Sequence, residues 1–109
     1  MRIDTRARSI PKAVKLRVAE RDSIDGWPCC INCGRPTPDG GIEWSNAHYI
    51  SRAQEGLGIE ENVLTLCPDC HHDFDQTTKR EEMRPHIRAY LMEHYPGWDE
   101  SNLVYRKGR

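Results

Sequence analysis

The sequence predicts a small α+β domain whose apolar core is too thin to be stable without a cross-link. The chain has 109 residues, of which 37% are hydrophobic, and its aromatic side chains are limited to one Phe, three Trp and four Tyr. Segments with helical and strand-like patterns follow one another, and five cysteines contribute to the hydrophobic fraction. Domains this small bury little apolar surface and commonly depend on disulfides or a bound metal. We therefore expect the cysteines to supply a cross-link.

The N-terminal part is predicted to contain one helix, over residues 9–21. Ser9 can cap this helix, Pro11 suits its first turn, and apolar residues recur four positions apart along it. Residues 22–26, with two Asp, a Ser and a Gly, are expected to end it.

The middle of the chain is predicted to hold two strands separated by loops. Residues 34–41 are rich in Gly and Pro and indicate a loop. Residues 42–50 favour a strand because they include Trp and Tyr, and residues 51–58 form a second loop. The short apolar run at residues 63–66 is typical of a buried strand.

The C-terminal part is predicted to be helical. One helix is expected from about His71, and the capping-box pattern at residues 78–81 indicates the start of another. Pro85 predicts that this second helix kinks or starts later, near Met83. Residues 103–105 form a candidate edge strand.

The cysteines form two C-x-x-C units, Cys30–Cys33 and Cys67–Cys70, with Cys29 left over. Two pairs supply four thiolates, which is the closed tetrahedral ligand set of a structural zinc site. The alternatives are a dithiol redox centre or two disulfides. The N-terminus lacks the apolar region of a secretory signal, and no thioredoxin-like pattern surrounds either pair. We therefore predict structural Zn²⁺, with Cys29 as a spare thiol or a competitor of Cys30.

Charge is distributed unevenly along a chain whose formal net charge is only −1. Residues 1–21 hold seven Lys or Arg against two acids, a net charge of +5. Residues 38–75 hold eight acids against one Arg, a net charge of −7. Both regions can be read as ordinary solvated surfaces. In the other interpretation, the basic region is an arm that binds a polyanion and the acidic region is a site that holds cations.

His48 and Asn62 lie between the two cysteine pairs, and a second histidine directly follows the last cysteine. His48 precedes Asn62 by fourteen residues, and His71 follows Asn62 by nine. In this order and spacing, residues 28–80 resemble the HNH endonuclease family, which has a ββα-metal fold. The resemblance implies residues 28–80 as a zinc-stapled core. A basic N-terminal arm and helix (1–27) and a C-terminal helix and tail (81–109) would pack on this core in a single domain.

The resemblance implies a role for each motif residue. His48 matches the general base that activates water, a role suited to imidazole because it titrates near neutral pH. Asn62 matches the residue that braces the loop and orients the base. His71 matches the catalytic metal ligand. Asp75 lies four residues later, so both side chains share one helix face.

The catalytic ion held by His71 and Asp75 is expected to be Mg²⁺ or Mn²⁺, with Ni²⁺ or Zn²⁺ as alternatives. His72 with Gln76 is a weaker ligand pair. Many family members carry Asp or His directly before the base, whereas this chain has Ala47, which cannot coordinate an ion.

DNA contacts are expected from basic residues near the first helix, after the base and near residue 80, although helix solvation is the alternative for each. These candidates are Lys12, Lys15, Arg17, Arg52, Lys79 and Arg80, and Arg21 belongs to the same basic N-terminal segment. No feature indicates base reading, so low sequence specificity is expected.

The lead interpretation is a metal-dependent DNA endonuclease that nicks or cuts both strands. The runner-up is a non-catalytic zinc module that binds DNA or protein, and the third is a redox protein. The resemblance to small phage HNH proteins implies a phage or prophage origin, the cytoplasm of a bacterial host, and a DNA-packaging terminase as a partner. No membrane association is expected, because the chain has no apolar run of about twenty residues.

Overall fold

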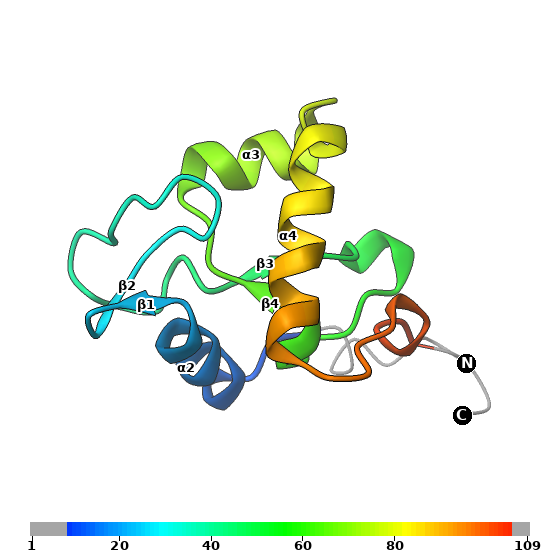
Figure 1. The fold of residues 1–109 in the computed structure, drawn as a ribbon, viewed down its shortest axis with the longest axis horizontal. Coiled ribbons are helices and arrows are strands. Elements are labelled where there is room, and N and C mark those ends of the chain that lie inside the picture. Colours follow the sequence, from blue (N-terminus) through cyan, green and yellow to red (C-terminus); the bar gives the residue numbers. More distant parts are fainter. Residues whose placement is uncertain (1–8, 106–109) are drawn as a thin grey trace.

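The computed structural model, which describes residues 9–105, is a small α+β fold built around a ββα unit (Figure 1). Strand β3 pairs antiparallel with β4, with Ala47 opposite Leu64 and His48 opposite Val63. Helix α3 follows directly, α2 packs beside β4, and α4 packs against α3. The helices and strands in chain order are α2 (Lys12–Arg21), β1 (Ser23–Ile24), β2 (Trp27–Pro28), β3 (Ala47–His48), β4 (Val63–Leu64), α3 (Pro68–Gln76) and α4 (Arg80–His94). Three short 3₁₀ turns are η1 (Arg52–Gln54), η2 (Glu60–Asn62) and η3 (Glu100–Asn102).

The α+β class and the flanking helices predicted from the sequence are confirmed. Within the described residues, none of the helices is long and apolar enough to cross a membrane. The first eight residues, which carry Arg2, Arg6 and Arg8 of the predicted basic arm, lie outside the described residues.

Helix α2 starts at Lys12, not at residue 9, so the predicted cap by Ser9 is wrong. Pro11 occupies the N-cap with extended geometry and makes no side-chain cap bond. The apolar face predicted for the helix is present: Val14 and Val18 are buried against Val63 of β4.

Residues 22–26 do more than end α2, because they lead into the β1–β2 hairpin that the prediction missed. Asp25 and Gly26 connect the strands with φ values of 53° and 83°. Positive φ at both central residues is typical of the tightest hairpin turns, which favour Asp-Gly. The signal was therefore present in the sequence.

The strand predicted over residues 42–50 is wrong in length, since only Ala47–His48 is a strand. Ser45 N–H donates to Ile42 O in a turn that interrupts the segment. The neighbouring chain still follows β4 loosely, because Leu66 N–H donates to Trp44 O at 3.1 Å. The predicted strand at 63–66 is likewise reduced to Val63–Leu64.

Helix α3 starts earlier than predicted, whereas α4 starts within residues 78–81, where the sequence indicated a helix start. Helix α3 begins at Pro68 rather than His71, because the Cys67 sulfur caps it by accepting from Cys70 N–H. Helix α4 begins at Arg80 and continues through Pro85, so the expected later start is wrong. The predicted capping box is absent, since no side chain caps α4.

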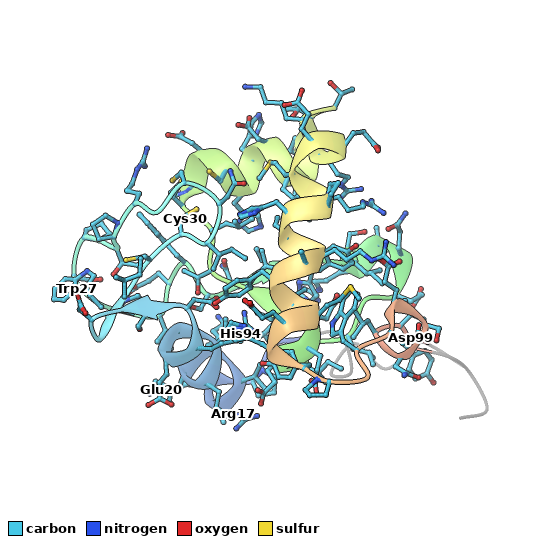
Figure 2. All side chains as sticks on the ribbon, in the orientation of Figure 1. Arg17, Glu20, Trp27, Cys30, His94 and Asp99 are labelled. Carbon is cyan, nitrogen blue, oxygen red and sulfur yellow. The ribbon has the colours of Figure 1, made fainter. Side chains whose placement is uncertain are left out.

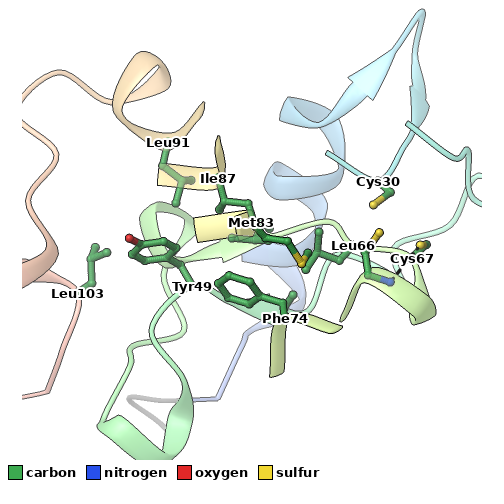
Figure 3. Close-up of a cluster of buried hydrophobic side chains, with 12 residues drawn as sticks. Cys30, Tyr49, Leu66, Cys67, Phe74, Met83, Ile87, Leu91 and Leu103 are labelled. Atoms are coloured by element: carbon green, nitrogen blue, oxygen red, sulfur yellow. Dashed lines mark hydrogen bonds between the residues drawn. The ribbon is translucent and has the colours of Figure 1, made fainter. Parts of the chain in front are cut away.

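The main core lies between α4, α3 and the β3–β4 pair (Figure 3). Met83, Ile87 and Leu91 on one face of α4 pack toward Tyr49 and Phe74. The four Cys of the two C-x-x-C units sit at one end of this core, where Cys30, Cys67 and Cys70 are buried. The core thus joins the cysteines to the strand that carries His48.

Candidate functional site

The four cysteines of the two C-x-x-C units come together into one cluster. Their sulfurs all lie within 4.8 Å of one another, and Cys33 Sγ is 3.7 Å from Cys67 Sγ. Four sulfurs arranged tetrahedrally at about 2.3 Å from Zn²⁺ would be about 3.8 Å apart. The ligand set and its spacing therefore suit a structural metal such as zinc.

Local turns shape this cluster from both sides. Gly34 follows the first pair at φ 83°, and its N–H donates to Cys30 O at 2.9 Å. Asn32 Nδ2 donates to Cys70 Sγ at 3.3 Å. Such donors satisfy thiolate sulfur, so the cluster is prepared for the charged form of its ligands.

The thiols of the cluster differ in acidity. Burial raises the pKa of the Cys30 and Cys70 thiols above the usual range. For Cys33, burial also opposes ionisation, but the Arg35 N–H and hydrogen bonds with neighbouring cysteines outweigh it and lower the pKa. Metal binding must displace protons from the first two thiols, so its affinity should weaken in acid.

Cys29 stands apart from the cluster, although it adjoins Cys30 in the chain. Its Sγ lies 3.2 Å from Trp27 O, to which it donates, and it is not one of the four clustered cysteines. Figure 2 shows Trp27 at the outer edge of the molecule.

A cavity of about 400 Å³ brings most of the other candidate residues together. It is lined by His48 and Asn46 around β3, His71 and Asp75 on α3, Lys15 on α2, and the segments containing Ser9–Ile10 and Ser51–Arg52. A histidine, an imidazole–carboxylate pair and two cationic side chains therefore face one space. Residues from distant parts of the chain come together in this arrangement when the chain folds.

Alternation along β3 decides which neighbours of His48 reach the cavity. Ala47 is fully buried and belongs to the core, whereas Asn46 and His48 line the cavity. Successive residues of a strand point to opposite faces. The alanine at position 47 is therefore a core residue here, and a polar side chain at that position would be buried.

Asn62 is fully buried and braces the segment that follows β3. Its Nδ2 donates to Ile50 O at 3.1 Å and to Leu57 O at 2.8 Å, while Oδ1 accepts from Ile50 N–H at 2.8 Å. Its backbone carbonyl accepts from Tyr49 N–H at 2.8 Å, directly after His48. The amide thus uses three hydrogen bonds to hold one loop.

His71 and Asp75 form a partly exposed pair on one face of α3. His71 Nε2 lies 2.9 Å from Asp75 Oδ2, and about a third of each side chain is exposed. One divalent ion can bind both an imidazole nitrogen and a carboxylate oxygen this close together, leaving its other coordination positions open. Their neighbours differ as expected, because Phe74 is buried in the core and His72 is exposed.

Of the six basic residues predicted to contact DNA, Lys15 and Arg52 line the cavity. Lys12 is exposed on α2. Arg17 pairs with Glu60 at 2.7 Å, Lys79 lies 3.7 Å from Asp73, and Arg80 Nε donates to Phe74 O at 2.8 Å.

Arg21, which the sequence placed with the basic surface residues, is a buried structural residue. Its guanidinium pairs with Asp22 at 2.7 Å and donates to Glu60 O, Val63 O and Tyr95 OH. Asp22 also accepts from Thr65 N–H and Tyr90 OH. This buried network connects α2 with β4 and α4, and no local sequence signal could have identified it.

Comparison with known proteins agrees with this arrangement. Residues 30–74 match the family model described as HNH endonuclease. No curated protein matches the chain significantly. The matched range contains the four clustered cysteines, His48, Asn62 and His71, and it ends one residue before Asp75. Residues 30–74 are therefore an HNH domain, and HNH proteins are generally endonucleases that act on DNA.

Proposed function

We propose that this protein is a metal-dependent endonuclease that hydrolyses phosphodiester bonds in DNA. The observation that carries the proposal is the cavity in which His48 faces the same space as the His71–Asp75 pair. Lys15 and Arg52 line this cavity as well, and their charges suit a phosphate group.

In the proposed reaction, His48 accepts a proton from water as the water oxygen attacks phosphorus. The bond from phosphorus to the 3′ oxygen breaks, and a solvent proton neutralises this oxygen. The products are a 5′-phosphate and a 3′-hydroxyl. His48 is only 8% exposed, and its backbone is held by the pairing of β3 with β4. Burial and strand pairing together limit where its imidazole lies.

His71 and Asp75 would hold the catalytic ion, which when bound stabilises negative charge on the phosphate and the leaving oxygen. An imidazole beside a carboxylate accepts Mg²⁺ or Mn²⁺, and also Ni²⁺ or Zn²⁺. The described side chains at this point supply two ligand atoms, so water and phosphate oxygens would complete the coordination. We therefore expect weak ion binding in the absence of DNA.

Lys15 and Arg52 are the proposed phosphate contacts, and low sequence specificity follows because phosphate contacts carry no base information. A phage or prophage origin and a terminase partner are further predictions, drawn from family resemblance alone.

Nicking of supercoiled plasmid in the presence of Mg²⁺, Mn²⁺, Ni²⁺ or Zn²⁺ tests the proposal. His48→Ala should lower the rate by about 10²–10⁴-fold, the usual contribution of a general base. His72→Ala is the matched control, because His72 is an exposed histidine of the same domain and does not line the cavity. The proposal fails if wild type nicks with none of the ions, or if His48→Ala nicks as fast as wild type.

A non-catalytic DNA-binding module is the second candidate, favoured by the buried Ala47 in place of a metal ligand. It predicts plasmid binding without cleavage under every ion. Fluorescence anisotropy with a labelled duplex, run beside the nicking assay, separates the two functions.

A further inference from the structure

The C-terminal segment, residues 98–105, lies along the loop that follows β3. Tyr105 N–H donates to Glu55 O and Leu57 N–H donates to Leu103 O, both at 2.8 Å. Gly56 and Val104 form an antiparallel bridge between these two bonds. The expected edge strand at residues 103–105 is therefore reduced to one bridge, and its partner is this loop.

The opposite side of the same loop is held by the core of the HNH domain. Asn62 bonds to Ile50 and Leu57, which are the two ends of the loop. Gly56 approaches so closely that a Cβ there would lie 1.7 Å from Ile50 O. Residues 50–57 are thus held between the Asn62 amide and the C-terminal segment.

The C-terminal segment is itself anchored beside the motif residues. Trp98 Nε1 donates to Glu61 O at 2.8 Å, next to Asn62, and its ring packs edge-on against Tyr49 at 5.5 Å. Tyr49 is the residue after His48, and its OH donates to Glu100 Oε2 at 2.6 Å. Leu103 is 2% exposed and completes the end of the core that contains Tyr49 (Figure 3).

We propose that the C-terminal segment is a positioning element for the phosphate-contacting loop of the active site. The loop carries Ser51 and Arg52, which both line the cavity with His48. The segment lies outside residues 30–74, so this chain would complete its HNH domain with an added piece. The effect on cleavage rests on the proposed nuclease function, whereas the effect on the loop does not.

Amide hydrogen exchange in the full-length, zinc-loaded protein tests the effect on the loop. Leu103→Ala removes the buried contact, and Leu103→Met should restore it. Ile24→Ala is the control, because Ile24 is 58% exposed in the β1–β2 hairpin (Figure 1). We expect Leu57 N–H to exchange about tenfold faster in Leu103→Ala, and Asp22 N–H at the end of α2 to keep its rate. Equal acceleration at both amides, or none at Leu57, would overturn the proposal.

A double-mutant cycle in the nicking assay tests the link to Arg52. Leu103→Ala should raise KM about tenfold with a smaller change in kcat, and in an Arg52→Ala background it should change KM less than twofold. If Leu103→Ala raised KM by the same factor with and without Arg52, the segment would have a purely structural role, and the proposal that it positions Arg52 would be refuted. If Leu103→Ala does not fold, Trp98→Phe, which removes the bond to Glu61 O and part of the ring that packs on Tyr49, replaces it in both experiments. Wild type that fails to nick refutes the nuclease function, while the exchange data alone decide whether the segment holds the loop.

Discussion

Helix α3 carries parts of two sites that differ in almost every physical respect. At its N-terminal end, Cys67 and Cys70 belong to a four-sulfur cluster in which three members are buried. Immediately afterwards, His71 and Asp75 form a two-residue pair with about a third of each side chain exposed. Structural metal sites use all their positions for protein ligands, whereas catalytic sites leave positions open.

The two sites also depend on different parts of the chain. The cysteine cluster is built from the turn at Cys30–Cys33 and the first turn of α3, so each turn places two ligands by itself. The cavity needs α2, β3, α3 and the loop at Ser51–Arg52 to meet. Loss of the cluster should therefore abolish the fold, whereas loss of the open pair should abolish only the chemistry.

The largest expected effect follows from opening the closed site. Cys67→Ser, or strong chelation, should unfold the chain, because a structural zinc ion contributes on the order of 10–16 kcal/mol in small domains. Circular dichroism with a zinc-release assay measures this. Cys29→Ser is the matched control and should keep both zinc and fold, since Cys29 lies outside the cluster. A folded, zinc-free Cys67→Ser protein would contradict the assignment of the cluster as the structural metal site on which the fold depends.

The second largest loss of stability is expected from breaking the buried network around Arg21 and Asp22. Asp22→Ala leaves the buried Arg21 guanidinium without its carboxylate and should lower the free energy of unfolding by about 3–5 kcal/mol. Urea denaturation provides the measurement. Lys79→Gln removes a largely exposed ion pair and should cost less than about 1 kcal/mol. Similar losses in both variants would show that Asp22 is not a buried anchor.

Breaking the open pair should separate activity from stability. Asp75→Asn should slow nicking about a hundredfold or more, because a bound ion supplies several kcal/mol of transition-state stabilisation. Its urea midpoint should stay near wild type, since the pair is partly exposed. The contrast between the two sites would collapse if Asp75→Asn unfolded the chain or released the structural zinc.

The smallest expected effect is the loss of stability at alkaline pH that follows from three partly buried tyrosine hydroxyl groups. Burial raises the pKa of Tyr49, Tyr90 and Tyr95, and the carboxylates of Glu100 and Asp22 add to this at the first two. The unfolded chain loses these protons from about pH 10, while the folded protein keeps them, so stability is intact below that pH and falls above it. Each proton contributes at most about 1.4 kcal/mol per pH unit.

Urea unfolding at several alkaline pH values measures this dependence. Tyr90→Phe should reduce the slope by up to one proton, because Phe cannot ionise. An unchanged slope in Tyr90→Phe would show that the Tyr90–Asp22 contact does not control this titration.

Local spacing by itself determined the cysteine pairs, the His71–Asp75 face and the order of the ββα unit. Two residues between cysteines, or three between helix positions, place side chains through backbone geometry alone. The Asp-Gly turn of the β1–β2 hairpin belongs to the same class, although the prediction overlooked it.

Only the tertiary structure decided which charges face the cavity and which are buried. Arg17 and Arg21 lie one helical turn apart, yet Arg21 is enclosed by Glu60, Val63 and Tyr95, and Arg17 pairs with an exposed part of Glu60. The short β3 and the pairing of residues 103–105 with the loop after β3 likewise depend on segments about 15 to 50 residues away. Contacts between distant segments set the burial of a side chain, and the spacing of residues along one segment does not predict these contacts.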